Sequence, residues 1–200
     1  MRDRDVRQSV WRWLEATHQG DADTLMLDEL GILNGATRVD IAVINGQIEG
    51  YELKSERDTL ERLPNQRDLY NKVIDRISLV VAENHREAAE EIIPDWWGLA
   101  VASVCGGTVV VTRERRPEMN PELDAAALAS LLWRDEALAV LELYGAARGV
   151  KSKPREALYK RLADTLDLDT LRAEVRSSLK ARIGWRADRR FQQYGGLRQS

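Results

Sequence analysis

The sequence predicts an α/β fold with a mixed central sheet flanked by helices, followed by an all-helical C-terminal appendage. Apolar runs of strand length recur between residues 24 and 112, with stretches of helical periodicity among them. Asn45-Gly46 separates two of these runs, as expected for a β-hairpin. From Asn120 onward, leucines recur at helical spacing and the strand pattern does not return.

Length and composition indicate a soluble globular protein. Two hundred residues suffice for one medium domain, or for one domain with a small appendage. Hydrophobic residues make up 44% and charged residues 32%, and no apolar stretch approaches the roughly 20 residues that span a bilayer. Met1 to Asp5 lack the apolar region of a signal peptide. We therefore expect a cytoplasmic protein without a membrane partner.

The single cysteine, Cys105, cannot form an internal disulfide, and this suits a reducing compartment. It stands at the end of an apolar run, before Gly106-Gly107. We expect it to be a small buried residue rather than a nucleophile.

The first elements follow from hydrophobic spacing. Apolar residues recur at helical spacing over residues 3–18, which predicts an amphipathic helix. The short apolar run 24–32 indicates a strand, or a tight turn leading into one. The hairpin is expected over residues 38–54.

The next elements alternate between helix and strand. Leu63-Pro64 begins a helix, because proline is tolerated in the first helical turn. The continuous apolar run 77–82 predicts a strand that is buried on both faces. The remaining elements are a short helix over 85–93, ended by Pro94, and strands over 97–104 and 108–112.

The hairpin carries two acids and a lysine. Asp40 lies inside the apolar run Val39–Ile44, and the second run ends in Glu52-Leu53-Lys54. Burying an unpaired carboxylate is unfavourable, so such groups neutralise, pair or bind metal. Two carboxylates and an ammonium on one hairpin therefore suggest a site for a divalent cation.

The register of the hairpin decides whether this site can form. Because side chains alternate between faces, Glu52 and Lys54 share one face. A two-residue turn at Asn45-Gly46 would put Asp40 and Glu52 on opposite faces. A metal site requires instead a three-residue loop, or a bulge, for which Gly50 is the natural place.

These residues resemble a known superfamily. An aspartate at 40, a gap that contains a hairpin, and then Glu52-Leu53-Lys54 is similar to the motif of the PD-(D/E)XK phosphodiesterases, which have the restriction-endonuclease-like fold. Glu29 resembles the upstream acid of many members. Gln66 and Tyr70 resemble the accessory glutamine and tyrosine that follow the Glu-x-Lys strand in some branches.

Residues 52–63 and 94–98 also resemble an uncharacterised bacterial and prophage family of that fold. The resemblance covers about residues 22–114, and it departs from the motif at Val39, where many members have proline. The implied organisation is a PD-(D/E)XK nuclease-like core at 1–116, a helical region at 117–186 and a tail at 187–200.

The resemblance implies a metal-dependent hydrolase. Asp40 and Glu52 would coordinate Mg²⁺ or Mn²⁺, which are hard cations that prefer oxygen. The main-chain carbonyl of Leu53 would add a ligand, and Glu29 would join directly or through water. Lys54 would orient the attacking water or neutralise the transition state.

Gln66 has two interpretations. It either belongs to the site or satisfies a backbone group at the start of its helix. The implied catalytic residues are Asp40, Glu52, Lys54 and Gln66, and the implied metal ligands are Glu29, Asp40, Glu52 and Leu53.

The C-terminal region is expected to be helical. Asn120-Pro121 reads as a helix cap, and further helices are expected over 135–148, 154–166 and from a cap at Asp169 to about 184. Its leucines, glycine and lysines resemble a SAP-type helix-extended-helix DNA-binding module. The residues that carry this resemblance are Leu138, Leu141, Gly149, Lys151, Lys153, Leu158 and Leu162.

Charge is unevenly distributed along the chain. Residues 145–200 contain 14 Lys and Arg against 6 Asp and Glu, a net charge of +8, whereas the whole chain carries −3. The rest of the chain therefore carries −11. A basic C-terminal region fits a polyanion such as DNA, and the alternative is a solvated helical tail.

Two classes of function remain open from the sequence. The first is a Mg²⁺-dependent DNA endonuclease in bacterial or phage DNA processing, repair or defence, with RNA as an alternative substrate. The second is a nucleic-acid- or protein-binding module that keeps the nuclease fold without hydrolysis. A homodimer is compatible with either, because many enzymes of this fold dimerise.

Overall fold

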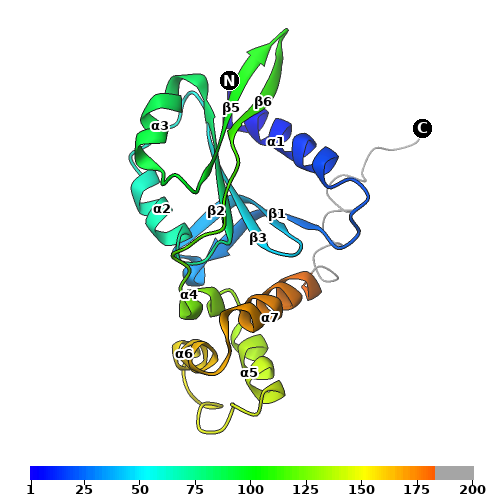
Figure 1. Ribbon diagram of the computed structural model, residues 1–200, viewed down its shortest axis with the longest axis vertical. Coiled ribbons are helices and arrows are strands. Elements are labelled where there is room, and N and C mark those ends of the chain that lie inside the picture. Colours follow the sequence, from blue (N-terminus) through cyan, green and yellow to red (C-terminus); the bar gives the residue numbers. More distant parts are fainter. Residues whose placement is uncertain (183–200) are drawn as a thin grey trace, which may run out of the picture.

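The computed structural model describes residues 1–182, in which six strands form one mixed sheet with helices on both faces (Figure 1). The strands lie in chain order: β1 (Leu25–Ile32), β2 (Thr37–Ile44), β3 (Ile48–Lys54), β4 (Arg76–Ala82), β5 (Gly98–Cys105) and β6 (Thr108–Arg115). The helices are α1 (Asp3–Thr17), α2 (Leu63–Tyr70), α3 (Arg86–Ile92), α4 (Ala125–Ala129), α5 (Arg134–Leu143), α6 (Arg155–Thr165) and α7 (Leu168–Ala181), with short 3-10 turns η1 (Leu33–Gly35) and η2 (Glu83–His85).

The sheet combines both strand directions. β1, β2 and β3 pair antiparallel, β3, β4 and β5 pair parallel, and β6 returns antiparallel to β5. The two parallel connections run through α2 and α3, as crossovers between parallel strands require. The predicted mixed α/β sheet flanked by helices is confirmed.

Two layers of apolar side chains cover the sheet. Val6, Val10 and Leu14 of α1 are fully buried against one face, in a cluster with residues such as Ile41 and Leu53. The other face lies beneath α2 and α3, and the same apolar cluster continues into α4 to α7 (Figure 1). The helical region therefore shares one hydrophobic core with the sheet.

A buried ion pair attaches the helical region to the hairpin. Arg172 Nε of α7 lies 2.8 Å from Oδ1 of Asp75, a residue that is 1% exposed. The other oxygen of Asp75 accepts a hydrogen bond from the main-chain nitrogen of Ile48, at 2.8 Å. The pair thus connects α7 to the start of β3.

The structure corrects several boundaries in the helical region. Asn120 does not cap a helix: its buried amide donates to the carbonyls of Asn71 and Ile74, at 2.6 and 2.8 Å. The helix α4 begins later, with Asp124 as its cap, and α5 ends at Leu143 rather than 148.

The cap of the last helix is also corrected, since Asp167, and not Asp169, accepts the capping hydrogen bond, from Thr170. α7 ends at Ala181. The predicted tail at 187–200 lies outside the described residues.

Cys105 is exposed, so the prediction of a buried residue is wrong. The β5–β6 hairpin projects beyond the rest of the sheet (Figure 1), and Cys105 stands at its tip. Val104, also near the tip, is 57% exposed. The apolar run at the end of β5 predicted burial, but the strand extends beyond the helices that cover the sheet.

The β2–β3 hairpin has the three-residue loop that the metal-site hypothesis requires. Ile44 pairs with Ile48, so the loop consists of residues 45–47. Within it, the main-chain nitrogen of Asn45 donates to the carbonyl of Gln47, at 3.1 Å. Because the loop has an odd number of residues, extending this register by one pair places Asp40 directly across from Glu52 on the neighbouring strand.

Gly50 is a site of close packing rather than a bulge. The β2–β3 register is continuous through Gly50, which pairs with Ala42. A Cβ atom at Gly50 would lie 3.1 Å from Cγ2 of Val39 and 3.2 Å from Cγ2 of Ile74. Both neighbours are fully buried and have little room to move.

In the described residues, no helix is both long and apolar enough to cross a membrane.

We expect Gly50→Ala to lower the free energy of unfolding by about 1–3 kcal/mol, because the added methyl overpacks Val39 and Ile74. Urea denaturation measures this loss. Gly46→Ala is the matched control in the same hairpin, since no atom lies within 4 Å of a Cβ there. Equal stability of the two variants would contradict the packing argument.

Candidate functional site

The candidate site lies where β2 and β3 separate. Their pairing ends at Ile41 and Tyr51, one residue before Asp40 and Glu52, although β3 continues to pair with β4 as far as Lys54. Oδ2 of Asp40 accepts a hydrogen bond from the main-chain nitrogen of Leu53, at 2.9 Å. A side chain thus replaces the carbonyl that a paired strand would offer.

Glu52 is buried, and both of its carboxylate oxygens have hydrogen-bond partners. It is 2% exposed, and its Oε1 accepts from Nζ of Lys54 at 2.8 Å and from Nε2 of Gln66 at 2.6 Å. The hydroxyl of Tyr70 lies 2.7 Å from its Oε2. Residues from β3 and α2 therefore converge on one carboxylate.

Gln66 contacts the predicted site residues rather than a backbone group. Its Oε1 accepts from Nζ of Lys54 at 2.9 Å, while its Nε2 donates to Glu52. The ammonium of Lys54 has three protons, and these contacts use two of them. Within residues 1–182 the third proton has no acceptor, and it could serve a water or a phosphate oxygen.

The pKa of Glu52 is raised above its ordinary value. Burial is the largest cause, and the charge of Asp40 adds to it, while Lys54 and the hydrogen bond from Tyr70 act in the opposite direction. An ionised Glu52 is thus incompletely compensated by the groups around it. Additional positive charge between Glu52 and Asp40 would relieve this.

Tyr70 connects α2 to both sides of the strand separation. Its hydroxyl lies 2.6 Å from the carbonyl oxygen of Arg38 as well as 2.7 Å from Glu52. Because it has one proton, it donates to one of these acceptors at a time. Burial and the charge of Glu52 raise its pKa, so it stays protonated at neutral pH.

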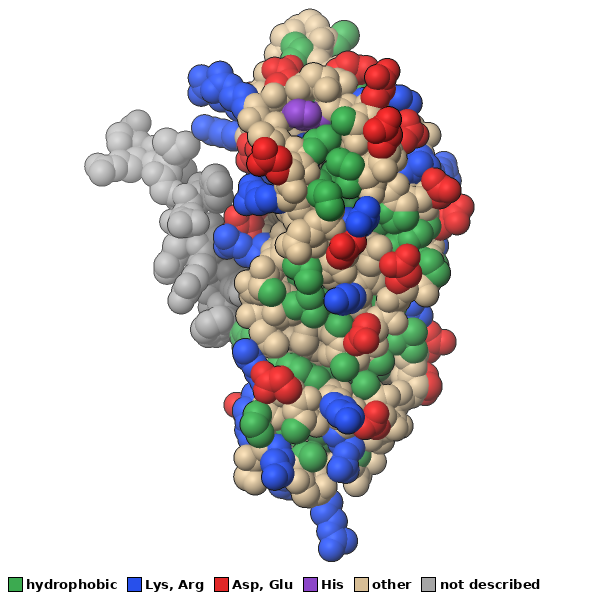
Figure 2. Space-filling model, turned by 90° about the vertical axis from the view of Figure 1, so that its left-hand side faces the viewer, with side chains coloured by type: hydrophobic (Ala, Val, Ile, Leu, Met, Phe, Trp, Pro, Cys, Tyr) green, Lys and Arg blue, Asp and Glu red, His purple; other side chains and the backbone are tan. Residues whose placement is uncertain are grey.

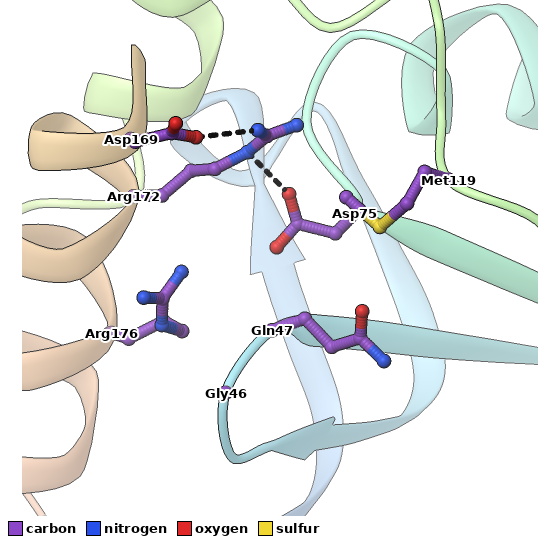
Figure 3. A pocket seen from close by; sticks show the side chains of 7 residues that line it. All are labelled: Gly46, Gln47, Asp75, Met119, Asp169, Arg172 and Arg176. Carbon is purple, nitrogen blue, oxygen red and sulfur yellow. Dashed lines mark hydrogen bonds and ion pairs between the residues drawn. The ribbon is translucent and has the colours of Figure 1, made fainter. Parts of the chain in front are cut away.

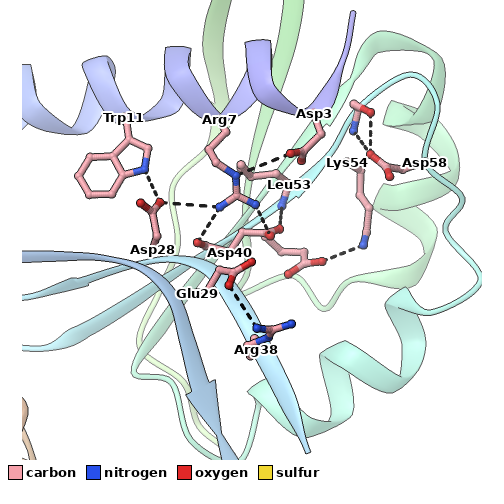
Figure 4. Close-up of polar contacts among 12 residues, drawn as sticks. Asp3, Arg7, Trp11, Asp28, Glu29, Arg38, Asp40, Leu53, Lys54 and Asp58 are labelled. Carbon is pink, nitrogen blue, oxygen red and sulfur yellow. Dashed lines mark hydrogen bonds and ion pairs between the residues drawn. The ribbon is translucent and has the colours of Figure 1, made fainter. Parts of the chain in front are cut away.

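Arg7 reaches the site from α1, which covers the other face of the sheet from α2 (Figure 4). Its guanidinium donates to Oδ1 of Asp40 at 2.7 Å and to the carbonyl oxygen of Asp40 at 3.0 Å. It also lies 3.7 Å from a carboxylate oxygen of Asp3 and 3.8 Å from one of Asp28. Burial alone would lower the pKa of Arg7, but these three carboxylates raise it.

Glu29 points to a different partner. It pairs with Arg38 at 3.2 Å, and its backbone adopts a φ of 55°, which is unusual for a residue other than glycine. Its neighbour Asp28 instead accepts from Nε1 of Trp11 on α1, at 2.7 Å. Both acids are drawn in Figure 4. Glu29 therefore lies on β1, the strand next to Asp40, but its ion pair is with Arg38 rather than with the residues around Asp40 and Glu52.

The oxygen donors fit a magnesium-type ion with two protein carboxylates. Among residues 1–182, no three His, Cys, Asp or Glu side chains are grouped closely enough to hold a metal. Mg²⁺ is nevertheless usually held by one or two carboxylates and keeps several waters. Asp40 and Glu52 would supply the carboxylates, with the Leu53 carbonyl as the main-chain candidate between Glu52 and Lys54.

A hollow of about 250 Å³ lies at the other end of the hairpin, beside α7 (Figure 3). Arg172 and Asp75 pair across it, and Asp75 is held by Ile48. The ion pair between Arg172 and Asp75 thus attaches the helical region to the hairpin. The loop residues Gly46 and Gln47, which also line this hollow, lie at the opposite end of β3 from Lys54. The lining residues are Gly46, Gln47, Asp75, Met119, Asp169, Arg172 and Arg176.

Arg7 is the site residue that the sequence reasoning missed. Asp3, Arg7 and Trp11 recur every four residues and border the buried stripe of α1. Residues at this spacing lie on one side of a helix. The signal was present, but its partners on β1 and β2 are distant in sequence.

The described structure is thus that of a mixed α/β protein with a buried carboxylate–lysine pair beside a second carboxylate. The family described as Bacteriophage P4 protein cII matches residues 1–197, and the chain belongs to this family. Protein cII of Enterobacteria phage P4 is 21% identical over 182 residues, which cover 91% of this chain and 68% of that protein. No solved structure matches the chain significantly.

We expect Tyr70→Phe to lower the free energy of unfolding by about 1.5–3 kcal/mol at a pH above the pKa of Glu52, because a buried, ionised Glu52 loses a hydrogen-bond donor. The hydrogen bond lowers the pKa of Glu52, so it favours the ionised form. Its contribution is therefore lost as pH falls through the raised pKa of Glu52, and the difference in stability between the two proteins should be smaller at a pH below that pKa.

Tyr159→Phe is the matched control. The hydroxyl of Tyr159 donates to the carbonyl of Leu132, at 2.9 Å, and this acceptor does not titrate. Its loss should cost the same at both pH values in urea denaturation. A pH-independent cost for Tyr70→Phe would contradict the assigned role.

Proposed function

We propose that the chain is a divalent-metal-dependent nuclease of the PD-(D/E)XK class that hydrolyses phosphodiester bonds in DNA. The observation that carries the proposal is the arrangement of Asp40, Glu52 and Lys54 where two strands separate. The strand order around this arrangement supports a restriction-endonuclease-like fold, since the hairpin is followed by a helix and a parallel strand.

The chemistry follows from what each side chain can hold. A bound Mg²⁺ or Mn²⁺ would polarise the scissile phosphate and lower the pKa of a coordinated water. Lys54 would donate its third ammonium proton, which has no acceptor in the described part of the chain, to that water or to a phosphate oxygen, and Gln66 holds the ammonium in place. Positioned donors of this kind stabilise charge that develops in the transition state.

Access to the site is from the Asp40 side. The side chain of Asp40 is 24% exposed, whereas those of Glu52 and Lys54 are 3% and 5% exposed. A phosphodiester therefore meets Asp40 first. Glu52 and Lys54 act from beneath it.

The helical region is the proposed DNA-binding surface. From the end of α5 to the first residue of α6, residues 144–155 contain four Lys and Arg and no acid. Leu143, just before this segment, and Tyr144, its first residue, are exposed, and the segment overlaps the residues that carry the SAP-like resemblance. The lower end of the molecule in Figure 2 carries several basic side chains. Cations placed in this way attract phosphate independently of base sequence.

The similarity to a protein of phage P4 is compatible with a role in bacterial or phage DNA processing, repair or defence. Such a role would be performed in the cytoplasm. RNA is the alternative substrate, and a homodimer is the alternative to a monomer.

A binding module without hydrolysis is the second candidate. The observation that favours it is the near closure of the site: Glu52 and Lys54 are buried and bonded to each other. The nuclease proposal is preferred because both acids and the lysine of the motif, Asp40, Glu52 and Lys54, are present where β2 and β3 separate.

Plasmid DNA incubated with the protein should be cut with Mg²⁺ or Mn²⁺ and remain intact with EDTA. Asp40→Ala and Lys54→Ala should each reduce the rate by a factor of about 100 or more, because each removes a group that acts on the reacting phosphate or water. Gel electrophoresis over time measures the rate. Cutting that persists in EDTA or in both variants would reject the mechanism.

Glu61→Ala and Lys72→Ala are the matched controls. They remove one negative and one positive charge, as Asp40→Ala and Lys54→Ala do, but at exposed positions within residues 1–116. They should cut like the original protein. Absence of cutting by every protein, with DNA binding retained, would favour the non-hydrolysing module.

We expect the double variant Arg148→Gln and Lys153→Gln to bind DNA more weakly and to reduce the salt dependence of binding. Two lost phosphate contacts lower the slope of log affinity against log salt by about two. Fluorescence anisotropy with a labelled duplex measures both. Arg116→Gln with Lys72→Gln removes the same charge from exposed positions of the core, and an equal effect there would contradict the assignment.

A further inference from the structure

Arg7 occupies a carboxylate oxygen of Asp40 that a metal ion would need. One guanidinium nitrogen donates to Oδ1 of Asp40 at 2.7 Å, and another donates to the carbonyl oxygen of Asp40 at 3.0 Å. Oδ2 is bonded to the main chain of Leu53. Asp40 therefore offers its outward carboxylate oxygen to an arginine from the N-terminal helix.

We propose that Arg7 competes with the divalent cation for Asp40, so that α1 keeps the site closed without metal and releases Asp40 when metal binds. The inference rests on the proposed function, since it assumes that Asp40 is a metal ligand. It assigns a regulating role to a residue outside the hairpin motif.

Electrostatics makes the two states exclusive. A guanidinium and a divalent cation at one carboxylate oxygen repel each other at short range, where screening by solvent is weak. The cation therefore binds only to molecules in which Arg7 has moved away. Its apparent affinity is lowered by the small fraction of molecules in that state.

Arg7 can move while α1 stays in place. The helix is held by its buried stripe, Val6, Val10 and Leu14, and by a hydrogen bond from Ser9 to the carbonyl of Val109, at 3.0 Å. None of these contacts involves Arg7. A rotation of one long side chain is therefore sufficient.

Two other carboxylates already lie near the guanidinium of Arg7. Asp3, one turn earlier on α1, lies 3.7 Å from it, and Asp28 on β1 lies 3.8 Å from it. The side chain of Arg7 is 24% exposed, so its path towards Asp3 is not enclosed. These partners reduce the cost of leaving Asp40.

A purely structural Arg7 would behave differently. If it only fastened α1 to the sheet, its removal would destabilise the protein equally with and without metal. Competition requires that its removal destabilise the metal-free protein and strengthen metal binding. The affinity for metal therefore separates the two roles.

The test measures Mg²⁺ and Mn²⁺ binding by isothermal titration calorimetry, with the rise in melting temperature as a second readout. Arg7→Met, which keeps the length of the side chain, should bind metal about tenfold more tightly, equivalent to about 1.4 kcal/mol. Arg7→Lys should lie between it and the original protein. Circular dichroism establishes that each variant is folded.

Arg4→Met is the matched control, because Arg4 is an exposed arginine on the same helix. It should leave the metal affinity unchanged. In an Asp40→Asn background, Arg7→Met should no longer alter metal binding.

The outcomes separate this inference from the proposed function. If the original protein binds metal and Arg7→Met binds no more tightly, the competition is rejected and the metal site stands. If only Arg7→Met binds metal, the competition is supported in its strongest form. If neither binds, both the competition and the metal-dependent nuclease are rejected. If Arg4→Met has the same effect as Arg7→Met, general charge explains the result and the inference fails.

Discussion

The three-residue loop of the β2–β3 hairpin is the constraint on which the candidate site depends. Side chains alternate along a strand, so one residue fewer in the loop would move Asp40 to the other face relative to Glu52. The structure has Ile44 opposite Ile48, which leaves an odd number of residues between them. The two strands then part at the very position where these acids stand, and the main chain of Leu53 bonds to a carboxylate there.

The site buries two side chains of opposite charge, Glu52 and Lys54. Glu52 and Lys54 lie almost without solvent, and they are stabilised because Gln66 and Tyr70 complete their hydrogen bonds. Breaking such a set is costly, since any remaining charge would be left unpaired. The burial of Glu52 and its proximity to Asp40 together raise its pKa, and a positive charge placed beside both carboxylates would lower it.

Each layer of the fold supplies a different part of the arrangement. The strands provide the acids and Lys54, α2 provides the groups that hold them, and α1 provides the arginine that covers Asp40. The helical region adds the basic segment 144–155 and is fixed to the hairpin through Arg172 and Asp75. The basic surface and the acidic site are therefore parts of one packed structure, because a single apolar core connects them.

The sequence by itself determined the order of the helices and strands and the hairpin, because these depend on local periodicity, and it left open whether Gln66 joins Glu52. It also showed that a metal site requires an odd register shift, although it left the three-residue loop and the bulge at Gly50 as alternatives. Only the tertiary structure showed that the hairpin has the three-residue loop and no bulge at Gly50. It also showed that Cys105 is exposed and that Arg7 contacts Asp40. These features depend on how far each layer extends and on contacts between segments that are distant in the chain, and no local pattern records them.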